Sequence, residues 1–396
     1  MTMTTASDSR PIRVGVVGAG AIAQRGILPH LSQPDMAGRV VLEAVCDPAP
    51  DRAKAAAKKF NVAASYESFD TMLAKADVDI VTLCSPIGLH FEQGRAALNA
   101  GRHVHFNKTM TTTVAEADEL IDLAERKNLR IVASPGEVLR PQHQHIRRLV
   151  QDGELGTICW SICGASLGRY HENEAFRQGD DALSNVDPSW YFRKPGGGPL
   201  YDMSVYALHG LTTVLGPVQS VTAMSGVRVK EREFRGTMMP TDAHDNTLML
   251  LGFGDALHAV VYGCAAGGMT FGFYPNIYGT HGRIEGLTLN GEPMQYPGRD
   301  IVDQAPGRSG EAWVLPHVVG PHRDIGEHHV FEDVMQLVDW VRDGTPSPVT
   351  AEHARHVIDI IESAYLSAET GEARTLRTSF DAPVVEPSDA ADAAAR

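Results

Sequence analysis

Long apolar runs, positive charge and cysteine are all scarce in this sequence. No apolar run approaches the roughly 20 residues that a membrane-spanning helix needs, so we expect no membrane partner. The formal net charge of −14 disfavours nucleic acid and anionic membranes as partners. The five cysteines are scattered, and their odd number fits reduced thiols better than a disulfide framework. Because the polar stretch MTMTTASDSRP also lacks the apolar core of a secretory signal, we expect a cytoplasmic protein.

The pattern of the chain changes near residue 140, and 396 residues are enough for two domains. Before that point strand-like runs alternate with periodic helical segments, which predicts an α/β, doubly wound parallel sheet of the Rossmann type. After it, strand-like runs separated by Gly, Asp and Pro predict an α+β domain with a large, mainly antiparallel open sheet. The C-terminal helical segments could pack back on the first domain. We expect a tail at 1–10, a dinucleotide-binding domain at 11–140, a substrate-binding and oligomerisation domain at 141–380 and a flexible tail at 381–396.

A dinucleotide site is indicated by the stretch IRVGVVGAGAIAQRG, which begins at Ile12. Its apolar run followed by G-x-G-x-x-A predicts a strand, a tight turn and the start of a helix. Gly18 can adopt the backbone conformation of the turn, and Gly20 has no side chain to block a pyrophosphate. The N–H groups at the helix start, beside Ala21 and Ile22, would then face the pyrophosphate.

The second predicted strand, Val40 to Pro48, strengthens this interpretation because a glycine pattern alone is a weak signal. The strand contains Asp47 near its end, where a carboxylate can accept hydrogen bonds from both ribose hydroxyls. Asp47 comes later than the usual spacing, so we expect an insertion, QPDMAGR, in the first crossover. We predict NAD rather than NADP, because Asp47 would repel a 2′-phosphate. Arg52 nearby leaves NADP as the alternative.

Further candidate residues follow the predicted fourth and fifth strands, Ile80–Leu83 and Val104–Phe106. Ligands in doubly wound sheets bind at the carboxyl ends of the strands, so residues at this edge are candidates for the cofactor site. They are Ser85, Pro86, His90, Asn107 and Lys108.

A second set of candidates lies on one predicted helix, Leu200 to Leu215, which follows a glycine-rich segment between Pro195 and Pro199. Asp202, Tyr206 and His209 stand at positions i, i+4 and i+7, so they share a helix face. The glycines would let the start of this helix come close to a bound nicotinamide. Without further information, Asp202 could simply cap the helix, Tyr206 could be a core aromatic and His209 a satisfied polar residue.

Over residues 11–375 the order of these features resembles the glucose–fructose oxidoreductase/inositol dehydrogenase (Gfo/Idh/MocA) family. That family typically carries Glu-Lys-Pro after its fifth strand. Asn107-Lys108-Thr109 stands there in this sequence, so the lysine is kept and both neighbours differ. These departures concern the geometry of the cofactor loop more than the chemistry, because the amine is retained.

The family also carries a helix motif of Asp, then His four residues later, then Asp three beyond that. Asp202, Tyr206 and His209 hold these positions here. Tyr in place of His is similar to family members that act on pyranose sugars, where Tyr serves as the proton-transfer group. His209 in place of the last Asp is a departure that concerns substrate contacts.

The chemistry of these residues suits the oxidation of a secondary alcohol, which needs a proton acceptor while hydride leaves to nicotinamide. Tyr206 could accept the proton if the ammonium of Lys108 stabilised its phenolate. Asp202 would orient this pair, and His209 could bind a neighbouring hydroxyl or relay the proton. The scheme needs no metal.

Other residues admit more than one interpretation. His143, in the run PQHQH, is a surface residue at a helix start or, by the resemblance, a neighbour of the site. Trp190 and Arg193 could line a sugar face, by stacking in the case of the tryptophan, or could form an aromatic core corner. The cluster formed by His322, His328 and His329 has metal-like spacing, yet a contribution to a substrate pocket is the better interpretation.

We therefore predict an NAD-dependent oxidoreductase that acts on a secondary hydroxyl, C3 by preference, of a sugar, glycoside or cyclitol. One alternative is a glycoside hydrolase that works through transient oxidation by NAD and elimination. A second is a non-catalytic NAD-binding regulator, suggested by the changes around Lys108 and at His209. We expect a homodimer or homotetramer that pairs through the C-terminal sheet.

Overall fold

The computed structural model describes residues 10–166, 168, 177, 179–265, 273–299, 314–383 and 385. Most of the expected N-terminal tail and most of the expected C-terminal tail lie outside these residues. Within them, no helix combines the length and the apolar character that crossing a membrane requires.

The first domain is built on a six-stranded parallel sheet with strand order β3-β2-β1-β4-β5-β6, which confirms the predicted doubly wound fold. The strands at the centre of the sheet, β1 and β4, are mostly apolar and buried because both faces of such a sheet are covered. Their bounds are β1 Ile12–Val17, β2 Val40–Cys46, β3 Ala64–Tyr66, β4 Ile80–Leu83, β5 His103–Phe106 and β6 Ile131–Ala133. The expected insertion before β2 contains one short 3-10 turn, η2, at Pro34–Met36.

Five α-helices connect these strands: α1 Leu28–Leu31, α2 Arg52–Phe60, α3 Phe69–Lys75, α4 His90–Asn99 and α5 Val114–Arg126. The start of α5 shows why the sequence forms a helix there. Thr113 accepts a hydrogen bond from the N–H of Glu116, and the Glu116 side chain accepts one from the N–H of Thr113, which is a capping box. Gly101, just beyond α4, has φ +77°, as expected for a helix end.

The second domain is built on a nine-stranded mixed sheet with order β16-β15-β14-β13-β7-β12-β11-β8-β17. Only β7 and β12 pair in parallel, so the prediction of a mainly antiparallel sheet is confirmed. The strands are β7 Ile158–Ser166, β8 Ser220–Gly226, β11 Asn246–Gly254, β12 Leu257–Cys264, β13 Asn276–Gly279, β14 Arg283–Glu285, β15 Thr288–Leu289, β16 Glu292–Pro293 and β17 Arg374–Thr375. A separate hairpin consists of β9 Glu231–Phe234 and β10 Thr237–Pro240.

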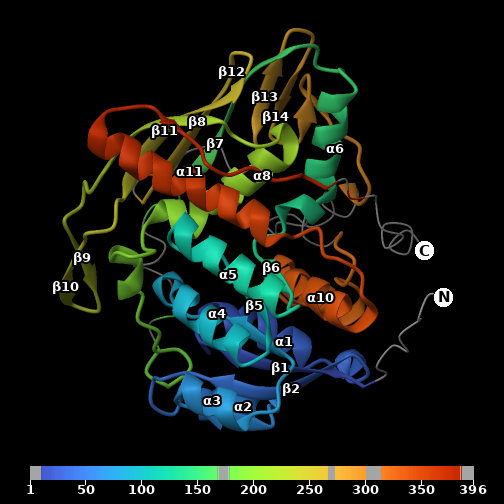
Figure 1. Cartoon of the computed structure of the whole chain (residues 1–396), viewed down its shortest axis with the longest axis vertical. Coiled ribbons are helices and arrows are strands. Elements are labelled where there is room, and N and C mark those ends of the chain that lie inside the picture. The colour runs from blue at the N-terminus through green and yellow to red at the C-terminus, as the bar shows by residue number, and fades with distance from the viewer. Residues whose placement is uncertain are drawn as a thin grey trace.

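Helices cover one face of the large sheet, as Figure 1 shows for α8 and α11. Contacts join α11 to β8 and α8 to β7, and α6 packs on α8. The last two long helices contact different parts of the first domain. Helix α11 contacts α5, whereas α10 packs on β5 and β6 of the first sheet. The C-terminal helical segments therefore reach back to the first domain. The bounds are α6 Pro141–Gln151, α8 Val205–Leu215, α10 His328–Asp343 and α11 Ala351–Thr370.

Candidate active site

A cavity of about 680 Å³ lies where the carboxyl ends of β1, β4 and β5 meet the start of α8 and the start of α10. This is the sheet edge at which doubly wound folds bind their ligands. The lining residues come from both domains, so each domain contributes one wall. Most of the predicted site residues lie on these walls: Gly18, Gly20, Ala21, Ile22, Asp47, Arg52, Ser85, Pro86, Asn107, Lys108, Trp190, Asp202 and Tyr206.

The glycine turn after β1 has the shape that a pyrophosphate requires. Gly18 has φ +88°, and a Cβ there would lie 2.7 Å from the backbone of Cys84. At Gly20 a Cβ would meet no protein atom closer than 3.8 Å, so the missing side chain leaves open space in the cavity. Ala21 and Ile22 continue the wall toward the helical turn η1, Ala23–Ile27. The turn therefore fits a dinucleotide pyrophosphate, whose charge the helix start would attract.

Asp47 and Arg52 line the cavity beyond the end of β2. Asp47 accepts hydrogen bonds from the N–H groups of Ala19 and Ala49, both at 2.9 Å, and pairs with Arg52 at 3.3 Å. Its side chain is only 6% exposed, yet it borders the cavity, where it can accept a ribose hydroxyl. Asp47 thus borders the cavity at the end of β2, which is the position that the sequence analysis expected.

Arg52 also holds a segment of the second domain, residues 182–187, which we call the strap. Its Nε donates to the carbonyl of Ala182 at 2.9 Å and its Nη2 to that of Asn185 at 2.5 Å. Gln24 adds a third tie, from its Nε2 to the carbonyl of Leu183 at 2.9 Å. Three of the five N–H groups of the Arg52 guanidinium are thus engaged by Asp47 and the strap.

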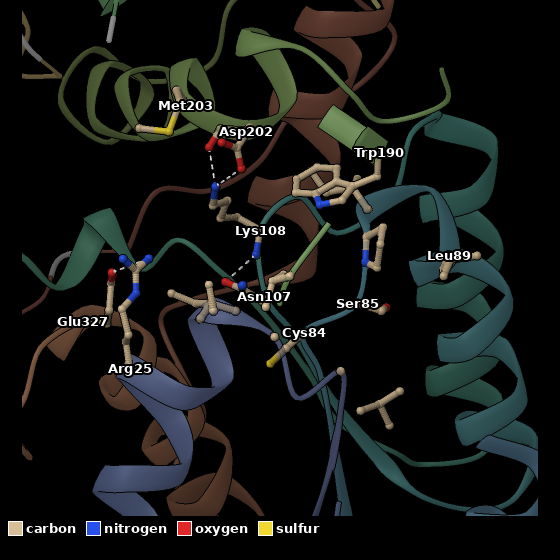
Figure 2. A pocket seen from close by; sticks show the side chains of 18 of the residues that line it. Arg25, Cys84, Ser85, Leu89, Asn107, Lys108, Trp190, Asp202, Met203 and Glu327 are labelled. Atoms are coloured by element: carbon tan, nitrogen blue, oxygen red, sulfur yellow. Dashed lines mark hydrogen bonds and ion pairs between the residues drawn. The ribbon is translucent and has the colours of Figure 1, made fainter. Parts of the chain in front are cut away.

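Lys108 and Asp202 form an ion pair across the cavity, between the end of β5 and the π-helical turn η7, Leu200–Ser204 (Figure 2). The ammonium of Lys108 donates both to the carboxylate and to the backbone carbonyl of Asp202. Their side chains are 11% and 6% exposed. The carboxylate of Asp202 therefore pairs with the ammonium of Lys108 and does not cap a helix. Of the two interpretations of Asp202, this geometry favours pairing with Lys108 over a helix cap. Asn107 supports the loop, since its Oδ1 accepts the N–H of Lys108 at 2.9 Å.

Tyr206 points into the same cavity from α8, but its hydroxyl is bonded to His329 rather than to Lys108. The Oη of Tyr206 lies 3.0 Å from Nε2 of His329, and Nζ of Lys108 lies 5.3 Å from the centre of the tyrosine ring. Burial, together with Glu327 and Asp202, raises the pKa of Tyr206 well above its usual value. Burial also lowers the pKa of His329 well below 6.5, helped by Arg140 and Lys108. Lys108 is not among the groups that shift the pKa of Tyr206, so stabilisation of its phenolate by Lys108 stays a prediction.

Six charged residues that line the cavity were not among the sequence-predicted site residues: Arg25, Glu137, Arg140, Arg177, Asp187 and Glu327. Glu137 and Arg140 pair at 2.7 Å just beyond β6, and Arg25 pairs with Glu327 at 3.3 Å, as Figure 2 shows for the second pair. Glu137 could have been found, since it follows a predicted strand at the ligand-binding edge. The run GEHH, which contains Glu327 and His329, offered only a histidine cluster as its signal.

Two predicted contacts lie behind the wall rather than on it. The ring nitrogens of His90 lie 2.8 and 2.9 Å from the carbonyls of Thr109 and Ser85, so this residue braces the loops after β4 and β5. His143 is buried, not a surface residue, and its Nδ1 lies 3.1 Å from the carbonyl of Glu137. Both act on the site through neighbours that line it.

Three groups that we expected in or beside the site lie elsewhere in the structure. His209 lies outside the cavity, buried with its ring 4.4 Å from that of His353, because one further turn of α8 points it toward α11. Arg193 pairs with Asp242 at 3.0 Å and is about half exposed. The glycines between Pro195 and Pro199 pack against backbone; a Cβ on Gly198, for example, would lie 2.5 Å from the carbonyl of His244.

The histidine cluster separates in space. His322 stacks on His30 and Phe331, and His328 lies at the edge of His30, whereas His329 alone of the three lines the cavity. Among the residues that the structure describes, no group of His, Cys, Asp and Glu is arranged to hold a metal ion.

Fold and site together indicate a dinucleotide-dependent oxidoreductase whose cavity is lined by residues of both domains. Comparison with known families agrees: residues 12–134 match the oxidoreductase family with an NAD-binding Rossmann fold, and residues 143–285 match the GFO/IDH/MocA C-terminal domain. The chain belongs to the Gfo/Idh/MocA oxidoreductase family.

Two curated relatives and one solved structure illustrate the likeness. D-glucoside 3-dehydrogenase of Escherichia coli K12 is 31% identical over 56% of this chain and 60% of its own, so the match spans less than two thirds of that relative. The dTDP-3,4-didehydro-2,6-dideoxy-α-D-glucose 3-reductase of Saccharopolyspora spinosa is 30% identical over 63% and 70%. Levoglucosan dehydrogenase in complex with NADH and L-sorbose superposes with a TM-score of 0.71 at 17% identity, covering 93% and 99%, which shows a shared fold.

Proposed function

We propose that this protein is an NAD-dependent dehydrogenase or reductase for a secondary hydroxyl, at C3, of a sugar, glycoside or cyclitol. The observation that carries the proposal is one cavity that brings together the glycine turn, the Lys108–Asp202 pair and the hydroxyl of Tyr206. The C3 position is supported by the two relatives above, whose names both specify it. Trp190, which lines the cavity, offers a flat face for stacking on a sugar ring.

Each residue has a defined task in this scheme. Bound nicotinamide supplies the hydride acceptor or donor. Asp202 fixes the ammonium of Lys108, which donates a hydrogen bond to the substrate oxygen and stabilises the negative charge that develops there. Tyr206 takes the hydroxyl proton during oxidation and returns it during reduction. Lys108 thus acts on the substrate, not on the phenolate.

The test is the appearance of NADH at alkaline pH with a panel of hexoses, glycosides, aminosugars and inositols. We expect one substrate class to give NADH, with kcat reduced at least 100-fold in Lys108→Ala and in Tyr206→Phe. Arg95→Ala, a change at a charged side chain on α4 that does not line the cavity, is the matched control and should retain full activity.

Other outcomes would point elsewhere. Free sugar released without net NADH would replace the proposal with the redox hydrolase. Bound NAD without turnover of any kind, unaffected by Lys108→Ala, would favour the regulator.

A further inference from the structure

The start of α10 is built so that two of its side chains reach the cavity opposite α8. Glu327, immediately before the helix, has a left-handed backbone with φ 58°, a conformation that a non-glycine residue adopts at a cost. Gly26 makes room for it, because a Cβ there would lie 2.4 Å from the Cβ of Glu327. Arg25 then holds the carboxylate at 3.3 Å (Figure 2). A strained backbone at a cavity wall points to a functional requirement for the position of Glu327.

His329 is the direct partner of the tyrosine hydroxyl in this arrangement. Its side chain is 16% exposed, its Nε2 lies 3.0 Å from Oη of Tyr206, and the carboxylate of Glu327 lies 4.0 Å from the same nitrogen. A neutral imidazole can accept a proton through one nitrogen, whereas the Lys108 ammonium has no vacant lone pair. The hydroxyl of Tyr206 is therefore hydrogen-bonded to the imidazole, and the carboxylate of Glu327 lies close enough to stabilise a positive charge on the ring.

Tyr206 needs such an acceptor because its surroundings oppose a free phenolate. Burial and the nearby carboxylates of Glu327 and Asp202 raise its pKa. The ammonium of Lys108 is already compensated by Asp202. If the tyrosine proton leaves as the substrate proton arrives, no phenolate has to form.

We propose that His329 is the proton acceptor behind Tyr206. During oxidation the substrate O–H bond breaks and its proton binds to Oη of Tyr206, while the original tyrosine proton moves to Nε2 of His329. The hydride leaves the same substrate carbon for nicotinamide, so the substrate loses two electrons and two hydrogens and His329 gains one positive charge. Glu327 stabilises that charge, and reduction reverses each transfer. The role rests on the proposed function and deepens it.

The charges around His329 set the pH dependence. Charged and titratable groups from several elements surround the His329–Tyr206 pair. They are Lys108 in the loop after β5, Asp202 in η7, Glu137 and Arg140 between β6 and α6, Arg25 in η1, Glu327 just before α10 and His328 at its start. Burial and the nearby cations Lys108 and Arg140 lower the pKa of His329. His329 is therefore neutral near pH 7 and able to accept a proton, and oxidation should decline only at acidic pH, where His329 is already protonated.

The test compares kcat and KM for oxidation between pH 4 and 10 in the full-length enzyme and in His329→Gln, with circular dichroism at each pH to confirm that both proteins remain folded. Glutamine can keep a hydrogen bond to Tyr206 but cannot take a proton. We expect kcat to fall about 100-fold with KM within twofold, and the acidic limb of the kcat profile to disappear. In His329→Ala, added imidazole should restore part of kcat. His258→Gln, at an exposed position on β12, is the matched control and should leave the profile unchanged.

Each result decides something. If His329→Gln retains kcat and the acidic limb while Lys108→Ala is inactive, His329 only positions Tyr206: the relay is overturned and the proposed function stands. The relay is also overturned if KM rises while kcat is kept. If the wild-type protein produces no NADH with any substrate, the proposed function fails and the relay with it.

Discussion

At the scale of single residues, the predicted preference for NAD over NADP depends on which groups the guanidinium of Arg52 already binds. The sequence left NADP open because a guanidinium stood near Asp47. In the structure that guanidinium binds Asp47 and the carbonyls of Ala182 and Asn185. Removing the carboxylate charge alone should therefore not create a site for a 2′-phosphate.

We predict that Asp47→Asn weakens NAD binding about tenfold, which corresponds to about 1.4 kcal/mol, because one acceptor for the ribose hydroxyls becomes a donor. NADP binding should remain weak in the same variant. Fluorescence titration with both cofactors measures the two dissociation constants. Asp51→Asn, a nearby carboxylate outside the cavity, is the control and should bind NAD like the wild type. Tight NADP binding by Asp47→Asn would contradict this account of Arg52.

The sequence indicated three of the four residues of the proposed catalytic arrangement, Lys108, Asp202 and Tyr206, for a definable reason. Lys108 and Asp202 were found because each belongs to a local motif with fixed spacing. His329 was seen only as one of three histidines, since it stands 123 residues from its partner Tyr206 and no local pattern links them. His209 was misplaced because a shared helix face was taken to mean a shared environment, although α8 meets the cavity only near its start.

At the scale of elements, strands were predicted well where apolar runs are bounded by turns, as for β2 and β4. The segment from Leu200 to Leu215 was expected as one regular helix, but it begins with the π-helical turn η7. That irregular turn places both the carboxylate and the carbonyl of Asp202 on Lys108. Periodicity could not show it, since a single π-helical turn of five residues is too short to change the pattern of a helix.

Buried histidines between elements make the fold sensitive to acid. His209, His353 and His356 lie together between α8, α11 and the segment after β17, where His353 stacks on Phe380 with ring centres 4.0 Å apart. Burial, with nearby His356, lowers the pKa of His209 to about 3, and burial lowers that of His356 to about 4. The unfolded chain binds protons at these groups near pH 6.5, whereas the folded chain does not.

We predict that stability falls as pH drops from about 6.5 toward 4, by up to about 1.4 kcal/mol per pH unit for each such histidine. Two groups behave differently. Burial raises the pKa of Asp333 to about 7, so the protonated form of Asp333 favours the fold at low pH. Glu332 raises the pKa of His317 to about 9 despite burial, so protonated His317 favours the fold until the pH rises through 9. Urea denaturation at pH 7 and pH 5 measures the difference.

The variant His209→Gln isolates one contribution to that pH dependence. Its stability should be lower at pH 7 but should fall less steeply toward pH 5, because one titrating group is gone. The exposed His258→Gln should keep the wild-type slope. An unchanged slope in His209→Gln would show that this histidine is protonated in the folded chain.

At the scale of the whole molecule, the large sheet has one face covered by helices and one that exposes apolar side chains. Trp160, Met224, Leu248 and Leu250 are 43%, 79%, 54% and 56% exposed on β7, β8 and β11. Leu248 pairs with Met224 across adjacent strands, and Trp160 stacks on Tyr278 with ring centres 4.4 Å apart. These side chains form a patch of the kind that is usually covered in solution.

We propose that a second copy of the chain covers this patch. A sheet face can pair with its own copy around a twofold axis, because the same residues then meet on both sides. We predict a dimer or a larger assembly by light scattering at micromolar concentration. The double variant Leu248→Lys and Leu250→Lys should be monomeric, because it places like charges opposite each other at the contact. Both side chains are more than half exposed on a strand away from the cavity, so the variant should fold and still bind NAD. Monomeric wild-type protein, or a double variant that assembles like the wild type, would exclude this face as the interface.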